Sequence, residues 1–210
     1  MEITKLEHSG IVITKAGKRI IFDPVEFEKT VPTFDNVIAV IITHKHSDHF
    51  QPAVLNRILS ANPSAKVFTT SDTAPLINNA IVVKAGDTYN VDGFKLDFFG
   101  KDHAAIVPGQ IPCENIGVVV DDSVVNPGDS FDLPVNVQPQ ILLVPTSAPW
   151  LKIVESMNYI EKAKPKMVIP VHDALLSNLG ETISNNWVKK ACESEASEFV
   201  YLKPGESREI

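Results

Sequence analysis

The sequence predicts an α/β (α+β) fold, in which two mixed β-sheets pack together with helices outside, as a single domain over residues 1–210. Strand-like patterns dominate the first half, and strands alternate with helices in both halves. No linker, low-complexity segment or short-period repeat divides the chain. A chain of this length buries about 70% of its unfolded surface. It therefore needs no disulfide or metal simply to fold, and a metal site would serve chemistry.

The opening third reads as a series of strands. Runs of β-branched residues flank the turn Ala16-Gly17-Lys18, which is typical of a β-meander. Val37–Ile42 is apolar at every position, as expected for a strand buried on both faces. Residues 25–35 contain Pro32 and several charges and are predicted to form a loop. The strands expected here are Glu2–Leu6, Ile11–Thr14, Arg19–Phe22 and Val37–Ile42.

The rest of the chain alternates between helices and strands. Val54, Leu55, Ile58 and Leu59 recur at helical spacing and predict a helix over Pro52–Ser60. The other expected helices are Ser71–Asn78, Leu151–Ala163 and Thr182–Glu193. The other expected strands are Lys66–Thr70, two or three from residue 80 onwards that include Phe94–Phe99, then Ile116–Val120, Ile141–Val144, Lys166–Val171 and Glu198–Leu202.

Composition narrows the classes of partner. The formal charge is −7 with no basic run, which argues against nucleic acid or an anionic membrane as a ligand. Cys113 and Cys192 are the two cysteines and form neither a disulfide framework nor a CxxC pair. Met1–Lys5 contains charged residues and no apolar run follows it, unlike in a secretory signal peptide. We therefore expect a cytoplasmic protein with a small-molecule substrate, either a monomer or a homo-oligomer.

Histidines cluster in one short segment. Three of the six lie in Thr43–Phe50, which contains the pattern HxHxDH directly after the buried strand. In extended backbone His44 and His46 point to the same side and can reach one ion, while Asp48 and His49 lie where the chain turns. Imidazole and carboxylate ligands suit Zn²⁺, and also Mn²⁺ or Fe²⁺. The alternative is a solvated, histidine-rich loop, but the position at a strand end favours a metal site.

Three further candidate ligands follow predicted strands. They are His103, Asp129 in Asn126–Ser130, and His172 after Met167–Val171. Taken alone, each has an ordinary interpretation as a loop residue, a turn residue or a cap. Beside the HxHxDH pattern, all three become candidate metal ligands that could converge on one edge of the sheets.

These motifs, in this order, resemble those of the metallo-β-lactamase-fold hydrolases over nearly the whole chain. The residues that carry the resemblance are His44–His49, His103, Gly128–Ser130 and Pro170–His172. Leu6–Ser9 and Phe22–Pro24 look like the branch that holds ascorbate-phosphate lactonases and small metal-dependent hydrolases. That branch usually has glycine where this chain has Glu7. The chain is also shorter than the lactonases, so the resemblance does not extend to lactonase activity.

The resemblance implies a four-layer αββα sandwich with two divalent ions at one edge, zinc first among the candidates and manganese or iron as alternatives. It implies that His44, His46 and His103 hold the first ion, that Asp48, His49 and His172 hold the second, and that Asp129 bridges them. A hydroxide activated by both ions would then attack a small ester, lactone, phosphodiester or amide, with Asp48 orienting it. The residual charge of +1 favours an anionic substrate.

Other residues carry weaker signals. His8 follows the first strand and is a candidate catalytic residue beside Asp48, in contact with substrate or with a ligand's partner. The alternative is a sheet-edge histidine with a purely structural role. We interpret Cys113 as an ordinary loop thiol. We interpret Pro149 as a helix start and Trp150 as a core residue, although the same segment could line a pocket.

Two other functions compete with hydrolysis. A mono-iron persulfide dioxygenase can retain HxHxDH and is the main alternative. Di-iron oxidoreductases of this fold usually have glutamate at the position of His46, which argues against them. A non-catalytic metal-binding protein is the third possibility, and the intact set of seven candidate ligands argues against it.

Overall fold

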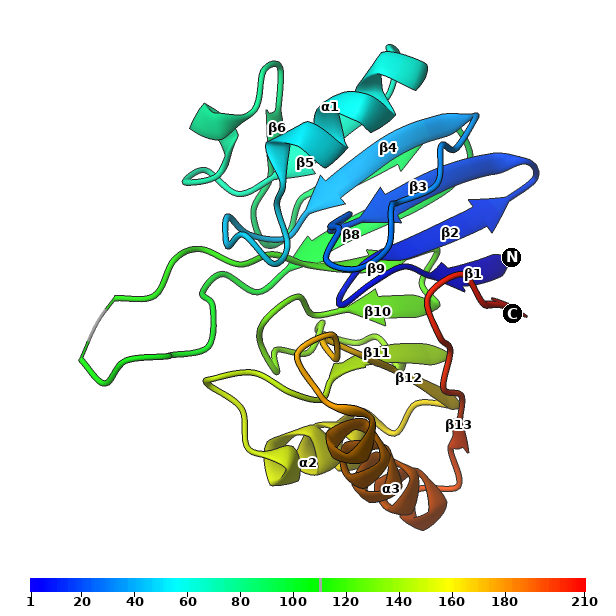
Figure 1. The fold of residues 1–210 in the computed structure, drawn as a ribbon. Coiled ribbons are helices and arrows are strands. Elements are labelled where there is room, and N and C mark those ends of the chain that lie inside the picture. Colours follow the sequence, from blue (N-terminus) through cyan, green and yellow to red (C-terminus); the bar gives the residue numbers. More distant parts are fainter. Residues whose placement is uncertain (110) are drawn as a thin grey trace.

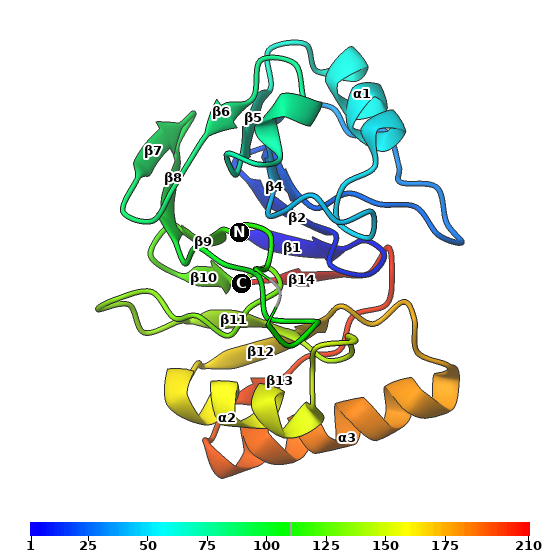
Figure 2. The ribbon, with the colours of Figure 1, turned by 90° about the vertical axis from the view of Figure 1, so that its left-hand side faces the viewer.

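The chain folds as two β-sheets packed face to face between helices. The computed structural model describes residues 1–109 and 111–210. Figure 1 shows α1 (Pro52–Ala61) on one side of the sheets, with α2 (Ile153–Ala163) and α3 (Asn178–Ser194) on the other. The turned view in Figure 2 shows the same four layers. Two mixed sheets flanked by helices confirm the predicted αββα fold class.

The first sheet contains the strands of the first 82 residues and the last strand. Its order is β14-β1-β2-β3-β4-β5-β6, within the described residues. The chain termini meet there, because the Met1 ammonium donates to the carbonyl of Ile210 over 3.0 Å. Its strands are β1 (Glu2–Lys5), β2 (Ile11–Lys15), β3 (Lys18–Phe22), β4 (Val37–Ile42), β5 (Lys66–Thr69), β6 (Ile81–Val82) and β14 (Ser207–Glu209).

The second sheet follows along the chain. Its order is β13-β12-β11-β10-β9-β8-β7, again within the described residues. Its strands are β7 (Thr88–Val91), β8 (Phe94–Phe99), β9 (Gly117–Val120), β10 (Val124–Asn126), β11 (Ile141–Pro145), β12 (Met167–Val171) and β13 (Glu198–Phe199).

Three hydrophobic layers hold the sandwich together. The central layer lies between the sheets and includes Phe22, Phe68 and Leu143. A second layer packs α1 on the first sheet, and a third packs α2 and α3 on the second sheet. Successive strand residues point to opposite faces, so a fully apolar strand such as β4 supplies both the central and the outer layer.

Strand direction brings six loops to one edge. β3 and β4 are parallel, and β1 has the same direction because both β1 and β3 are antiparallel to β2. In the second sheet, β10 and β12 are both parallel to β11, and β8 shares their direction because β9 is antiparallel to both β8 and β10. The loops that carry the predicted site residues follow these strands, so the predicted site residues lie at the same edge.

Several elements differ from the sequence-based expectation. Ser71–Asn78 contains only a 3₁₀ turn, Ala74–Leu76, because Pro75 supplies no backbone donor. The expected strand Glu198–Leu202 is reduced to the two residues of β13. Two strands were not expected from the sequence, because β10 is short and the residues of β14 are all exposed and so lack an apolar pattern. Helix α3 begins at Asn178, earlier than expected, with Ser177 accepting a bond from the Gly180 amide.

Candidate metal site

The structure brings all seven predicted metal ligands together at the edge where the two sheets meet. All seven side chains come from the loops after β4, β8, β10 and β12, and four of them lie in the loop after β4. Within the described residues, three groups of these side chains have ligand atoms within 4.8 Å of one another. The groups are His44–His46–His103, His8–Asp48–His49–His172 and His44–His49–Asp129.

The first group is a triangle of histidines. The ring centroids of His44, His46 and His103 lie 4.6–4.8 Å apart, pair by pair. His44 and His103 are buried, whereas His46 is half-buried and faces a cavity. This arrangement matches the first predicted ligand set.

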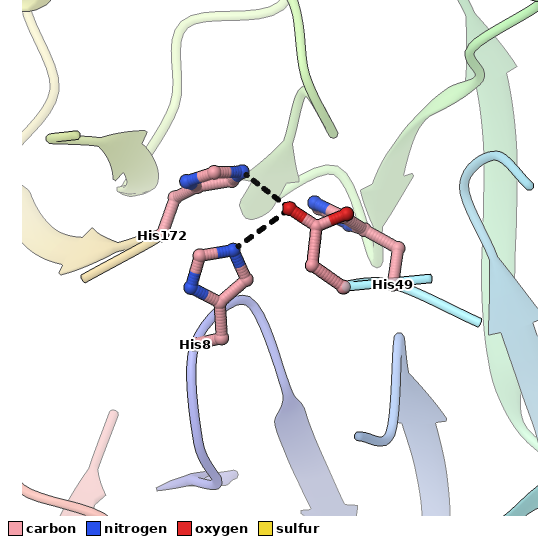
Figure 3. Close-up of side chains that lie close together, drawn as sticks. His8, His49 and His172 are labelled. Carbon is pink, nitrogen blue, oxygen red and sulfur yellow. Dashed lines mark ion pairs between the residues drawn. The ribbon is translucent and has the colours of Figure 1, made fainter. Parts of the chain in front are cut away.

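The second group surrounds the carboxylate of Asp48. Its Oδ2 lies 3.5 Å from Nε2 of His8 and 3.7 Å from Nε2 of His172. Figure 3 shows His8 and His172 pointing toward this oxygen, with His49 beside them. The structure therefore places Asp48, His49 and His172 together, as expected, and adds His8 to them.

Asp129 touches both groups. Its Oδ1 lies 3.1 Å from Nε2 of His49, and its Oδ2 lies 3.0 Å from His172 Nε2 and 3.3 Å from His103 Nε2. A carboxylate that reaches histidines of both groups is placed where a bridging ligand would have to be.

Hydrogen bonds at Nδ1 fix the tautomers of four buried histidines. Nδ1 of His49 bonds to Oδ2 of Asp23 over 2.9 Å, and Nδ1 of His103 and His172 bond to the carbonyls of Ala104 and Ser147. Nδ1 of His44 bonds to the Thr43 hydroxyl over 3.0 Å, and that hydroxyl donates onward to Asp23. Since carboxylate and carbonyl oxygens only accept, each Nδ1 carries a proton, and in the neutral form of each ring Nε2 presents a lone pair. Asp129 and Asp23 raise the pKa of His49 well above its ordinary value, so its Nε2 must lose a proton before it can bind a metal.

Those Nε2 atoms converge without hydrogen-bond partners. In the described part of the chain, six buried side-chain atoms have none, namely Nε2 of His8, His44, His49, His103 and His172 and Oδ1 of Asp129. A buried polar atom without a partner costs about 1–3 kcal/mol, so six together at one point need an explanation. Divalent cations satisfy the lone pairs of the other five atoms once His8 is set aside, and the donor set of imidazole and carboxylate fits Zn²⁺, Mn²⁺ or Fe²⁺.

His8 has the opposite tautomer. The backbone amide of Ala174 donates to its Nδ1 over 3.3 Å, so the proton of the neutral ring lies on Nε2. A protonated Nε2 cannot bind a metal, but it can donate toward Asp48. His8 is fully buried, and burial lowers its pKa, which keeps the ring neutral. The geometry distinguishes His8 from the other four buried histidines.

Three residues of the site have left-handed backbone. His8, Asp23 and His172 have φ values of 55°, 41° and 61°. Such a conformation costs a residue other than glycine about 1–3 kcal/mol and is typical of functional sites. Asp23 and His172 directly follow β3 and β12, and His8 lies in the turn between β1 and β2.

Carboxylates in the site stay ionised and His44 stays neutral. Burial opposes the charge on Asp129, but His49 and the neighbouring histidines hold its pKa well below its usual range. Burial likewise opposes the charge on Asp48, and its contact with His8 keeps the pKa low. Burial and the charge of His49 hold the pKa of His44 well below its usual value. These states are the ones in which the groups act as ligands.

Several residues that support the candidate ligands were not expected from the sequence. Asp23 accepts hydrogen bonds from Thr43 and His49. Its position within Phe22–Pro24, directly after a strand, was the only indication of this role in the sequence. Our interpretation of Trp150 as simply a core residue was wrong, because its indole donates to Oδ2 of Asp129 over 3.0 Å. Asn115 accepts from the Asp129 amide, and a Cβ on Gly128 would lie 2.3 Å from Asn115 Oδ1. Gly128 is therefore required by this close approach and by its φ of 62°.

Glu7 and Cys113 lie near the site and each has identifiable contacts. The Glu7 carboxylate accepts from the consecutive amides of Phe27, Glu28 and Lys29 over 2.7–3.2 Å. The glutamate therefore anchors the 25–35 loop. Cys113 Sγ lies 3.6 Å from Nε2 of His46, and burial raises the pKa of the thiol to about 11. It thus remains a neutral thiol beside a candidate ligand.

Two cavities flank the candidate metal site. One of about 310 Å³ adjoins His46 and His103 and is walled by residues from 104–107 and 111–113 and by Lys45, whose ammonium pairs with Asp72 over 2.8 Å. The other, of about 530 Å³, adjoins His8, Phe27 and Asp173. Both sizes suit small molecules.

Comparisons with known proteins agree with this geometry. Residues 2–172 match the family described as "Beta-lactamase superfamily domain". The protein named Rv0786c of Mycobacterium tuberculosis is 30% identical over 183 residues, covering 84% of this chain and 86% of that protein. A protein of Metallosphaera sedula named UPF0173 metal-dependent hydrolase is 25% identical, covering 100% of this chain and 99% of that protein.

A solved structure shows the same fold. A metallo hydrolase from the archaeon Ignicoccus hospitalis superposes with a TM-score of 0.74 at 20% identity, covering 100% of this chain and 98% of that one. No helix in the described part of this chain is long and apolar enough to cross a membrane. The family match spans most of the sequence and includes every candidate ligand. The chain therefore belongs to the β-lactamase superfamily, and its fold and relatives are those of that superfamily's metal-dependent hydrolases.

Proposed function

We propose that this protein is a metal-dependent hydrolase that uses two divalent ions to cleave a small, anionic ester, lactone or phosphodiester. Family membership and the metal-dependent hydrolases among its relatives support the hydrolase class. The proposal of two ions, zinc first among the candidates, depends on one observation in this chain. That observation is the convergence of unpartnered Nε2 atoms on Asp129 from two separate groups of histidines.

The residues divide into roles by their surroundings. His44, His46 and His103 would hold one ion, Asp48, His49 and His172 the other, and Asp129 both. Bound divalent ions lower the pKa of a coordinated water and polarise a carbonyl or phosphoryl oxygen. The Asp48 carboxylate is 30% exposed and stays ionised, so it can accept a hydrogen bond from a water and orient it.

His8 completes this arrangement without acting as a ligand. Its Nε2 lies 3.5 Å from Oδ2 of Asp48, and its Nδ1 is occupied by the Ala174 amide. We assign to His8 the role of fixing the Asp48 carboxylate, so that the other oxygen of Asp48 is available to the nucleophile or the substrate. The T-shaped contact with Phe27, with ring centroids 5.6 Å apart, restricts the rotation of the His8 ring.

Charge and cavity size indicate the class of substrate. Two divalent ions against the carboxylates of Asp48 and Asp129 leave net positive charge, which favours an anionic group. The cavities of about 310 and 530 Å³ are lined by both polar and apolar side chains. They suit a small substrate, while the formal charge of −7 disfavours a long nucleic acid.

Metal analysis of the protein purified without added metal tests this function. We expect two Zn²⁺ or Mn²⁺ per chain, together with hydrolysis of at least one member of a panel of chromogenic lactones, esters and phosphodiesters. One iron per chain would instead favour the dioxygenase alternative. Two ions without activity toward any compound of the panel, or of an extended set, would favour a non-catalytic protein.

The Asp129→Ala variant tests the bridging assignment. We expect loss of activity and less bound metal, because Asp129 contacts histidines of both groups. Asp132→Ala is a matched control, since Asp132 lies three residues away and does not belong to the three ligand groups found among the described residues. Full metal occupancy in Asp129→Ala would contradict the bridging role.

A further inference from the structure

A lysine is buried directly beneath the second group of candidate ligands. Lys5 ends strand β1, and its side chain is completely inaccessible to solvent. Its ammonium donates to the carbonyls of Leu6, over 2.9 Å, and of His8, and lies 3.3 Å from Oδ1 of Asp173. Lysine is almost never buried unless it is paired, and here three acceptors occupy its three N–H bonds.

The three acceptors lie in loops that follow strands of two different sheets. Leu6 and His8 lie in the turn after β1 of the first sheet, whereas Asp173 follows β12 of the second sheet and is adjacent to His172. The two loops also bond directly, because the His172 amide donates to the His8 carbonyl over 3.2 Å and the Ala174 amide donates to Nδ1 of His8. The Lys5 ammonium thus joins the two loops that bring His8 and His172 together.

We propose that Lys5 is a positioning residue that fixes the second metal position by clamping the His8 and His172 loops across the two sheets. The inference rests on the proposed function, because it concerns the His49–His172–Asp48 group. Without the ammonium, the Asp173 carboxylate, 13% exposed, loses its cation and moves toward water. Residues 172–174 move with it, so that the Ala174 amide leaves His8 and the His172 ring leaves Ser147 and Asp129.

The first metal position does not depend on this clamp. His44 and His46 follow β4, and His103 follows β8. His44 and His103 bond to Thr43, Ala104 and Cys113, and the His46 carbonyl accepts from the amides of His49 and Phe50. Lys5 and Asp173 take part in none of these bonds. The two positions are therefore expected to respond differently to the loss of Lys5, which separates a positioning role from general destabilisation.

The test compares Lys5→Met with the wild-type full-length chain. Methionine keeps the length and apolar stem of lysine and removes the charge and the donors. In Zn²⁺ titrations we expect one site of near wild-type affinity and a second weakened about 10- to 100-fold. Lys15→Met is a matched control, because Lys15 also pairs across the sheets, with Asp121 over 2.8 Å, but it ends β2 in the hairpin at the opposite end of the sheet. It should bind both ions normally.

A second measurement does not depend on metal. Long-range ¹H–¹⁵N correlation spectra of the imidazoles, recorded before Zn²⁺ is added, report which ring nitrogen carries the proton. We expect His8 and His172 to lose their single tautomers in Lys5→Met, while His44 and His103 keep theirs. Spectra identical to wild type for all four histidines, or two undiminished Zn²⁺ affinities, would overturn the proposal.

If Lys5→Met does not fold, Lys5→Met/Asp173→Asn takes its place, since the double variant leaves no unpaired buried charge and is expected to show the same loss of tautomers. If the wild-type chain binds only one Zn²⁺, the two-ion function is wrong. The tautomers of His8 and His172 then still decide whether Lys5 positions these loops.

Discussion

The indole nitrogen of Trp150 donates a hydrogen bond to Oδ2 of Asp129 over 3.0 Å. The same oxygen lies 3.0 Å from His172 and 3.3 Å from His103, whereas Oδ1 is buried with no hydrogen-bond partner among the described residues. Trp150 therefore fixes the rotation of a carboxylate that both histidine groups share. Outer partners of ligands matter for metal affinity because they orient the ligand atoms.

We predict that Trp150→Phe lowers metal affinity about 10- to 100-fold while the fold is retained. Phenylalanine keeps the packing against Phe131 but lacks the donor. The measurement is a competition titration with a chromogenic chelator. Trp187→Phe is the control, because Trp187 is 44% exposed on α3 and distant in sequence from the ligand loops. Equal affinities for the two variants would show that the indole bond has no such role.

His8→Ala should retain both ions and lose about 10- to 100-fold in activity. The Ala174 amide already occupies Nδ1, so His8 supplies a donor to Asp48 and no metal ligand. His8→Asn, which keeps a donor group, should recover part of the activity. Elemental analysis and kcat measurements on both variants check this. Loss of one ion in His8→Ala would instead make His8 a ligand.

Asp23→Asn should destabilise the protein by about 1–3 kcal/mol and weaken metal binding. The two oxygens of Asp23 accept from the Thr43 amide, the Thr43 hydroxyl and Nδ1 of His49, and an amide group would place a donor against a donor. Urea unfolding and Zn²⁺ titration measure the two effects. Asp92→Asn is the control, since Asp92 also has a positive φ, 48°, but is exposed; a similar loss there would refute the explanation.

The metal-free protein should lose stability as the pH rises above about 6.5. Burial lowers the pKa of His49, but Asp129 and Asp23 outweigh it and raise the pKa well above its ordinary value of 6.5. A raised folded-state pKa gives stability that is fully present below the unfolded value and is lost as the pH rises through the folded value. Urea midpoints between pH 6 and 8.5 measure this. With Zn²⁺ bound the dependence should weaken, and a midpoint that increases with pH would contradict the assignment.

Local patterns determined most of the fold and of the candidate site. The unbroken apolar run of β4 and the helical spacing in α1 are visible in the sequence because burial imposes them on neighbouring residues. The HxHxDH pattern can also be recognised in the sequence, because its four candidate ligands lie within six residues. His103, Asp129 and His172 needed the additional premise that loops after parallel strands meet at one edge.

Only the tertiary structure could decide the contacts between distant segments. Lys5 meets Asp173, His8 meets Ala174, and Trp150 meets Asp129, and no periodicity or motif links these positions. The tautomers of the histidines depend on such contacts, because the partner at Nδ1 decides which nitrogen faces the ion. The sequence alone determined which side chains supply lone pairs. The packing of the two sheets decided where those lone pairs point and made His8 a donor.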